Sequence, residues 1–266
     1  MSTSLTPVVF IHGLWIHATS WKPWIDFFKQ AGYDPIAPPW SGSADTIEAA
    51  RAHPEQAAGY GVNEIADHYA KIIGTLPSKP VVIGHSFGGL LAQVILGRNL
   101  ASAAVAIDPA PIKGVLALPF SALRVASVAL KNPANMKKAV SLTAAEFRYG
   151  FGNMLSHEDS EELFRRWTIP SPARPLFQAA FANFNPNAAT KVDTGNANRG
   201  PLLLIAGEHD HTAPPAITRG TLKLYHRSTA VTELKEIPNR GHSLTIDKGW
   251  REVAAIALDW LKTKTG

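Results

Sequence analysis

The chain contains no cysteine among its 266 residues. This absence excludes disulfide bonds, thiolate metal ligands and a cysteine nucleophile. Long apolar runs are also missing, whereas a bilayer span needs roughly 20 such residues. The first seven residues are polar and lack the basic flank of a signal peptide, and the apolar run that follows them ends at His12. We therefore predict a cytoplasmic protein without an integral membrane segment.

Charged residues are few, at 18% of the chain, and the net charge is +5. The basic residues are scattered, with Lys137-Lys138 and Arg165-Arg166 as the longest runs. A nucleic-acid surface needs a basic stripe or patch, so we predict no nucleic-acid partner. The chain shows no internal repeat, and its 45% hydrophobic content is typical of a well-packed globular protein. The sequence leaves a homodimer open.

Apolar, β-branched runs alternate with helical patterns along most of the chain. The runs that read as strands are residues 7–11, 33–37, 81–84, 103–107, 201–206 and 232–237. Such alternation predicts an α/β fold with a mostly parallel sheet of about six strands and helices on both faces. The polar stretch at 41–61 is predicted to be irregular.

The alternation stops between residues 111 and 196, where helical patterns continue without a convincing buried strand. We therefore predict an α/β core built from residues 1–110 and 197–266, with a helical insertion at 111–196. Many large apolar residues of this insertion are available to form its own core or to line a pocket. They also raise the idea of a lid over a lipid interface. These residues include Leu116, Leu118, Phe120, Leu123, Phe147, Phe151, Phe181 and Phe184.

The most informative motif is Gly84-His85-Ser86-Phe87-Gly88, which follows a predicted strand and precedes a predicted helix. Strand, glycine-flanked serine and helix form the layout of a nucleophile elbow. A turn this tight forces the serine backbone into a sparsely populated region, and neighbouring backbone passes close to it. Glycines at 84 and 88 permit that approach because they lack a Cβ atom. We predict that Ser86 is a catalytic nucleophile.

A serine nucleophile needs a base, and the base needs an orienting acid. Asp210 and His242 each lie just past a later predicted strand, where parallel sheets gather their sites. We predict Asp210 as the acid and His242 as the base, with Asp108 as a rival acid. His209 and His211 compete for the base, and because they flank Asp210 they also leave a metal site open, although we predict none.

The first predicted strand ends in His12-Gly13-Leu14-Trp15. A second oxyanion donor is expected from the loop after this strand, and Gly13 allows the backbone to turn toward the elbow. We predict that the backbone N–H groups of Leu14 and Phe87 form an oxyanion hole. Trp15 is predicted to line the substrate pocket, whereas the side chain of His12 is predicted to be structural.

Taken together, His12-Gly13-Leu14, the elbow at Ser86 and the Asp210/His242 pair resemble the α/β-hydrolase fold enzymes. The chain is most similar to the branch of small serine esterases, cofactor-free haloperoxidases and hydroxynitrile lyase-like proteins. This resemblance implies a helical cap at 111–196. The chain departs from the family pattern in that its first predicted strand corresponds to the third strand of the fold, so we expect the core to lack the usual N-terminal hairpin. Hydroxynitrile lyases of this branch carry a lysine after the base, and Ser243 stands there instead.

The predicted function is therefore a cofactor-free serine hydrolase that cleaves a carboxylic ester of a small or medium apolar substrate through an acyl-enzyme. The same triad also serves amide, lactone or C–C bond hydrolysis and haloperoxidase-like perhydrolysis. A small-molecule receptor that retains the hydrolase fold is a further alternative.

Overall fold

The computed structural model describes residues 5–265, and its centre is a six-stranded sheet. The strands lie in the order β2-β1-β3-β4-β7-β8, and each pairing is parallel. The predicted α/β fold with a mostly parallel sheet is thus confirmed. The bounds are β1 Thr6–Ile11, β2 Tyr33–Ile36, β3 Val81–His85, β4 Ala103–Ile107, β7 Leu202–Gly207 and β8 Thr232–Ile237.

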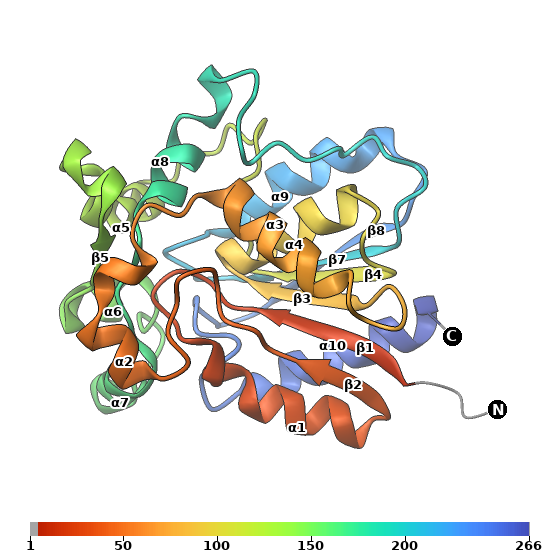
Figure 1. Cartoon of the computed structure of the whole chain (residues 1–266), viewed down its shortest axis with the longest axis horizontal. Coiled ribbons are helices and arrows are strands. Elements are labelled where there is room, and N and C mark those ends of the chain that lie inside the picture. The colour runs from red at the N-terminus through yellow and green to blue at the C-terminus, as the bar shows by residue number, and fades with distance from the viewer. Residues whose placement is uncertain (1–4, 266) are drawn as a thin grey trace.

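Helices cover both faces of the sheet (Figure 1). On one face lie α1 (Lys22–Gln30) and α10 (Trp250–Thr265), and on the other lie α3 (Val62–Ile73), α4 (Phe87–Gly97) and α9 (Pro215–Leu224). Successive residues of a strand point to opposite faces. Val8 and Phe10 accordingly pack with α1 and α10, whereas Val9 and Ile11 pack with α3 and α4. Both faces are buried, which explains why β1 is apolar throughout.

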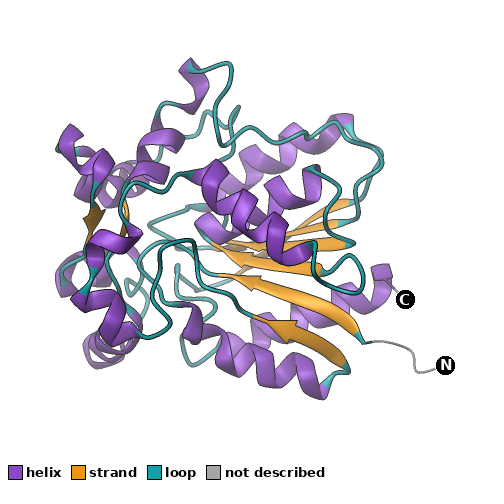
Figure 2. Cartoon of the chain, viewed as in Figure 1, coloured by secondary structure: helices purple, strands orange, loops and turns teal. Residues whose placement is uncertain are grey.

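Residues 111–184 contribute four helices near the carboxyl ends of the strands, toward which the arrowheads point in Figure 2, whereas residues 185–196 return along the core to the end of α4, where Asn196 donates to the carbonyl of Gly97. The helices are α5 (Phe120–Leu130), α6 (Ala144–Gly150), α7 (His157–Trp167) and α8 (Arg174–Ala180). A two-residue antiparallel pair, β5 (Ala139–Val140) with β6 (Ser171–Pro172), ties them together. This pair is too short to produce an apolar run in the sequence.

The 41–61 stretch contains helix α2 (Ile47–Ala52), so the prediction of an irregular segment is wrong there. The Thr46 hydroxyl caps α2 by accepting a hydrogen bond from the amide of Ala49. Arg51 then joins α2 to the 111–196 segment by donating to the carbonyl groups of Thr168 and Arg165. Within residues 5–265, no helix is both long and apolar enough to cross a membrane.

Candidate active site

Ser86 occupies the turn between β3 and α4 with φ 57° and ψ −121°. A non-glycine residue in such a region costs about 1–3 kcal/mol and persists only where its surroundings hold it. Here the amide of Ser86 donates to the carbonyl of Ile107 at 2.9 Å. The carbonyl of Ser86 in turn accepts the amides of Gly89 and Ala110 at 2.9 and 3.0 Å. The strained serine is therefore fixed by β4 and α4, and it is 4% exposed.

Three glycines bring the backbone close enough to form this turn. A Cβ atom on Gly84 would lie 2.0 Å from the carbonyl oxygen of Gly88, and one on Gly88 would lie 2.1 Å from that of Ile11. A Cβ atom on Gly13 would lie 2.7 Å from Cβ of Ser86. A Cβ atom on Gly84 or Gly88 would overlap backbone atoms, and one on Gly13 would push against Ser86. The loop after β1 therefore rests directly against the serine.

The structure brings Asp210 and His242 together at the ends of β7 and β8. The imidazole Nδ1–H of His242 donates to Oδ2 of Asp210 at 2.6 Å, and both side chains are fully buried. The other oxygen of Asp210 accepts the amides of Thr212 and Ala213 at 2.6 and 2.9 Å. These bonds place the proton on Nδ1 and leave Nε2 of His242 as the basic nitrogen.

Nε2 of His242 is buried and makes no hydrogen bond within residues 5–265, so the described chain does not join it to Ser86 by a hydrogen bond. The side chain of His85 nevertheless connects the serine turn to the backbone of His242. His85, the residue before Ser86, donates from Nε2 to the carbonyl of His242 at 2.9 Å, and the two rings lie 4.6 Å apart.

Asp108, the rival acid, lies just past β4 in a left-handed conformation with φ 44°. Its Oδ1 accepts the amide of Gly207 at 2.7 Å, while its Oδ2 lies 4.0 Å from Nδ1 of His242. Asp210 therefore makes the hydrogen bond to the base. Burial, together with the charge of Asp210, raises the pKa of Asp108 well above its usual range. The sequence pointed to Asp108 only as a rival acid, and it did not indicate that this carboxyl is buried beside the Asp210–His242 pair with a raised pKa.

The histidines that flank Asp210 do not compete for the base. His209 is about half exposed and faces Glu208, whereas Nδ1 of His211 bonds the carbonyl of Tyr149 at 2.9 Å. A different group, His85, Asp108 and His242, has ligand-type atoms within 4.8 Å of one another. One ring nitrogen of His85 and one of His242 are already hydrogen-bonded, to the carbonyl of His242 and to Asp210 respectively. We assign no metal to this group.

Among the predicted oxyanion donors, Phe87 is the first residue of α4, where an amide has no intrahelical partner. Leu14 follows Gly13 and is 2% exposed. His12, the residue after β1, is buried, and burial lowers its pKa to about 3. Its ring stacks on Trp40 and accepts the amide of that residue, so it is a neutral structural side chain.

Trp15 lies at the wall of the cavity into which Ser86 opens. Its backbone has φ 66°, a conformation that a bulky residue rarely adopts. The amide of Trp15 donates to Oγ of Ser171 at 2.7 Å, its indole N–H donates to the carbonyl of Val140 at 3.1 Å, and its carbonyl accepts the amide of Ile169. The sequence pointed to substrate contact and missed this attachment to the 111–196 segment.

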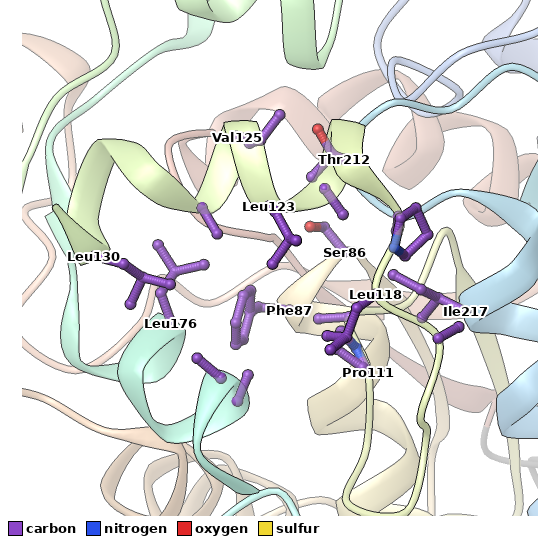
Figure 3. Close-up of a pocket in the computed structure, with 18 of the residues that line it drawn as sticks. Ser86, Phe87, Pro111, Leu118, Leu123, Val125, Leu130, Leu176, Thr212 and Ile217 are labelled. Carbon is purple, nitrogen blue, oxygen red and sulfur yellow. The ribbon is translucent and has the colours of Figure 1, made fainter.

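Ser86 opens into an apolar cavity of about 110 Å³. Figure 3 shows its hydroxyl oxygen among carbon side chains, with Thr212 as the other labelled polar neighbour. Much of the wall comes from small residues such as Ala122 and Ala126 of α5 and Ala179 of α8. Phe147 and Phe151 are instead buried in the core. The sequence analysis looked for large apolar residues and therefore overlooked these alanines, whose small side chains leave room for the cavity.

Comparison with known proteins identifies the family and supports the fold. A sequence model of the Alpha/beta hydrolase family matches residues 8–256. The proteins named ABHD8 from Homo sapiens and Bos taurus are each 35% identical to this chain over 80 residues. That stretch is 30% of this chain and only 17% of the length of those relatives.

Solved structures share the fold over nearly the whole chain. A monoacylglycerol lipase from Paleococcus ferrophilus has a TM-score of 0.64 at 20% identity, covering 97% of this chain and 94% of its own. A methylesterase from Arabidopsis has a TM-score of 0.66 at 15% identity, covering 97% of this chain and 100% of its own. With the family match, the parallel sheet and the strained serine between β3 and α4, the chain belongs to the α/β-hydrolase family.

Proposed function

We propose that this hydrolase-family protein cleaves carboxylic esters of small or medium apolar substrates through an acyl-enzyme on Ser86. The observation that carries the proposal is the strained Ser86 at an apolar cavity, with the His242–Asp210 pair at the adjoining strand ends. An esterase and a lipase among the structures of the same fold are consistent with it.

In this mechanism, Oγ of Ser86 attacks the acyl carbon while Nε2 of His242 accepts its proton. Asp210 holds the imidazole in the required tautomer and stabilises the imidazolium that forms. The amides of Leu14 and Phe87 bind the oxyanion. General base assistance of this kind contributes ~10²–10⁴-fold. The bond from the acyl carbon to the alcohol oxygen then breaks, and the alcohol leaves with the proton that Nε2 of His242 holds. Neutral His242 next takes a proton from water as the water attacks the acyl carbon. It returns this proton to Oγ of Ser86 as the carboxylic acid is released.

Residues 111–196 act as the cap in this proposal. The part of the cavity wall contributed by α5 and α8 is apolar and carries no charged side chain among the described lining residues. A neutral acyl or alcohol group is therefore favoured over a charged one, because an unpaired charge loses its hydration there.

The test is hydrolysis of p-nitrophenyl esters across a series of acyl lengths by wild type, Ser86→Ala and Ser78→Ala. Ser78 is an exposed serine before β3, at the opposite end of the strand from Ser86, and serves as the matched control. We expect Ser86→Ala to abolish turnover and to block labelling by a fluorophosphonate, seen as a loss of the mass shift. Activity that survives Ser86→Ala overturns the proposal.

The same experiment separates the alternatives. A panel of amides, lactones and peroxide with a carboxylic acid distinguishes the other reactions of the triad. A slow single turnover with retained product identifies a receptor.

A further inference from the structure

Large apolar side chains are exposed around the cavity of the 111–196 segment. Phe120 is 79% exposed and Phe184 is 86% exposed. Leu118 and Leu123, which flank Phe120 in the chain, line the cavity with part of their surface and remain 72% and 47% exposed. Figure 3 shows both leucines beside the cavity. Leu116 and Phe181 are also exposed. A water-facing surface with this many large apolar groups marks an interaction site.

Hydrogen bonds hold the two parts of this surface together. Gly114 donates its amide to Oδ1 of Asn183 at 2.7 Å, and Nδ2 of Asn183 donates to the carbonyl of Val115 at 2.9 Å. The chain before Leu116 is therefore fixed beside the turn that carries Phe181 and Phe184. We call residues 113–124 together with 181–184 the apolar face.

The apolar face lies in a stretch with cations and no acids. Residues 111–138 contain the basic residues Lys113, Arg124, Lys131, Lys137 and Lys138 and no aspartate or glutamate. Within residues 5–265, none of these five forms an ion pair with a carboxylate. Lys113 and Arg124 belong to the apolar face itself, where Lys113 donates to the carbonyl of Asn185 and Arg124 lies over the ring of Tyr149. Exposed aromatic and aliphatic side chains together with cations that have no carboxylate partner are the chemistry that binds an anionic lipid surface.

The same charges disfavour a second copy of the chain as the occupant. A two-fold dimer brings the same patch of both subunits together. Such contact through the apolar face would place two sets of uncompensated Lys and Arg side chains near one another. An anionic membrane supplies the opposite charge and an apolar interior at once.

We propose that the apolar face docks this protein onto an anionic lipid surface, with the cavity mouth turned toward the lipid. Docking itself depends only on the surface and not on catalysis. Its consequence, that an apolar ester passes from the lipid into the cavity of Ser86, rests on the proposed function.

The test is flotation of the full chain with phosphatidylcholine vesicles and with vesicles of equal parts phosphatidylcholine and phosphatidylserine. We expect binding to the second kind, weakened by added salt because the charges lie at the surface. Phe120→Ser with Phe184→Ser should reduce the affinity by about tenfold or more, since burying one phenylalanine in an apolar phase is worth at least that factor. Lys113→Glu with Arg124→Glu should abolish the preference for phosphatidylserine.

Val231→Ser is the matched control, because Val231 is an exposed apolar residue just before β8. It should bind vesicles as wild type does. The Phe120→Ser/Phe184→Ser variant should keep wild-type activity on a dissolved p-nitrophenyl ester, because neither residue lines the cavity. That activity also shows that the variant is folded.

Failure to bind either vesicle overturns the proposal, as does equal binding by wild type and the double phenylalanine variant. A dimer in sedimentation that disappears in that variant would identify the face as a self-association surface instead. The Ser86→Ala variant separates the two proposals. If it floats with anionic vesicles as wild type does, docking holds whether or not the protein is an esterase.

Discussion

Replacing Gly13 by alanine is the sharpest test of the contact between the loop after β1 and the serine. The new Cβ atom would lie 2.7 Å from Cβ of Ser86 and 2.9 Å from the carbonyl oxygen of His85. Ordinary contact between carbon atoms is about 3.5–4.0 Å, so about 1 Å of separation must be created.

Neither side of this contact yields freely. The backbone of Ser86 is bonded to Ile107 and Ala110, and the loop is anchored through Trp15 to Ser171 and Val140. Misplacement of a reacting group by 1 Å costs ~10²-fold in rate. Overpacking a filled interior also costs about 1–3 kcal/mol of stability. We therefore expect Gly13→Ala to fold, to melt at a lower temperature, and to lose about 100-fold in kcat.

The assay is steady-state hydrolysis of a short p-nitrophenyl ester together with calorimetric melting. Gly195→Ala is the control, because the nearest atom to its new Cβ would be 3.8 Å away. A largely unchanged KM is expected, since the apolar cavity wall is not altered. If Gly13→Ala keeps wild-type kcat and melting temperature, the loop is not packed against Ser86 as described.

Other predictions concern the buried titratable groups. Asp210→Asn should lower kcat by ~10⁴-fold because it disturbs the tautomer of His242, whereas Asp108→Asn should cost less than about tenfold, since Asp210 and not Asp108 makes the hydrogen bond to His242. Equal losses in kcat would mean that the two acids are misassigned. Because the folded pKa of Asp108 is raised, wild-type stability falls as pH rises above its unfolded pKa, and urea titrations of Asp108→Asn should show a shallower fall. Burial lowers the pKa of His12 from 6.5 to about 3, so the unfolded chain binds its proton first and stability is lost as pH falls below 6.5. The loss of unfolding free energy due to His12 approaches about 1.4 kcal/mol per pH unit. The urea midpoints of wild type and His12→Asn should therefore converge toward low pH. Midpoints that change in parallel with pH would contradict this role of His12.

The sequence predicted the strands well because each is a short run of apolar, β-branched residues bounded by turns. It also placed Ser86, Asp210 and His242 past the carboxyl ends of their strands, because a parallel sheet brings those ends to one edge. The structure agrees with this placement and adds the 2.6 Å bond between the acid and the base.

Features that depend on contacts distant in the chain were not predictable. Helix α2 has six residues, too few for a periodic pattern, and its place is set by bonds from Arg51 to residues more than a hundred positions away. The cavity depends on alanines of α5 and α8, and nothing in the sequence distinguishes these alanines from others in the chain. The raised pKa of Asp108 follows from its burial beside Asp210, which no local pattern encodes.

The attachment of Trp15 limits how this protein can be re-engineered. Three hydrogen bonds join Trp15 to residues 140, 169 and 171, and a fourth joins His17 to the carbonyl of Trp167. The 111–196 segment and the loop that touches Ser86 are therefore held together by these hydrogen bonds, and a shift of one should shift the other. A chimera that imports a foreign 111–196 segment without residues 12–17 would leave these partners unmatched and shift the serine. Exchanging residues 12–17 together with the 111–196 segment keeps these hydrogen bonds. The part of the chain that has to be exchanged therefore consists of two segments that are separate in the sequence.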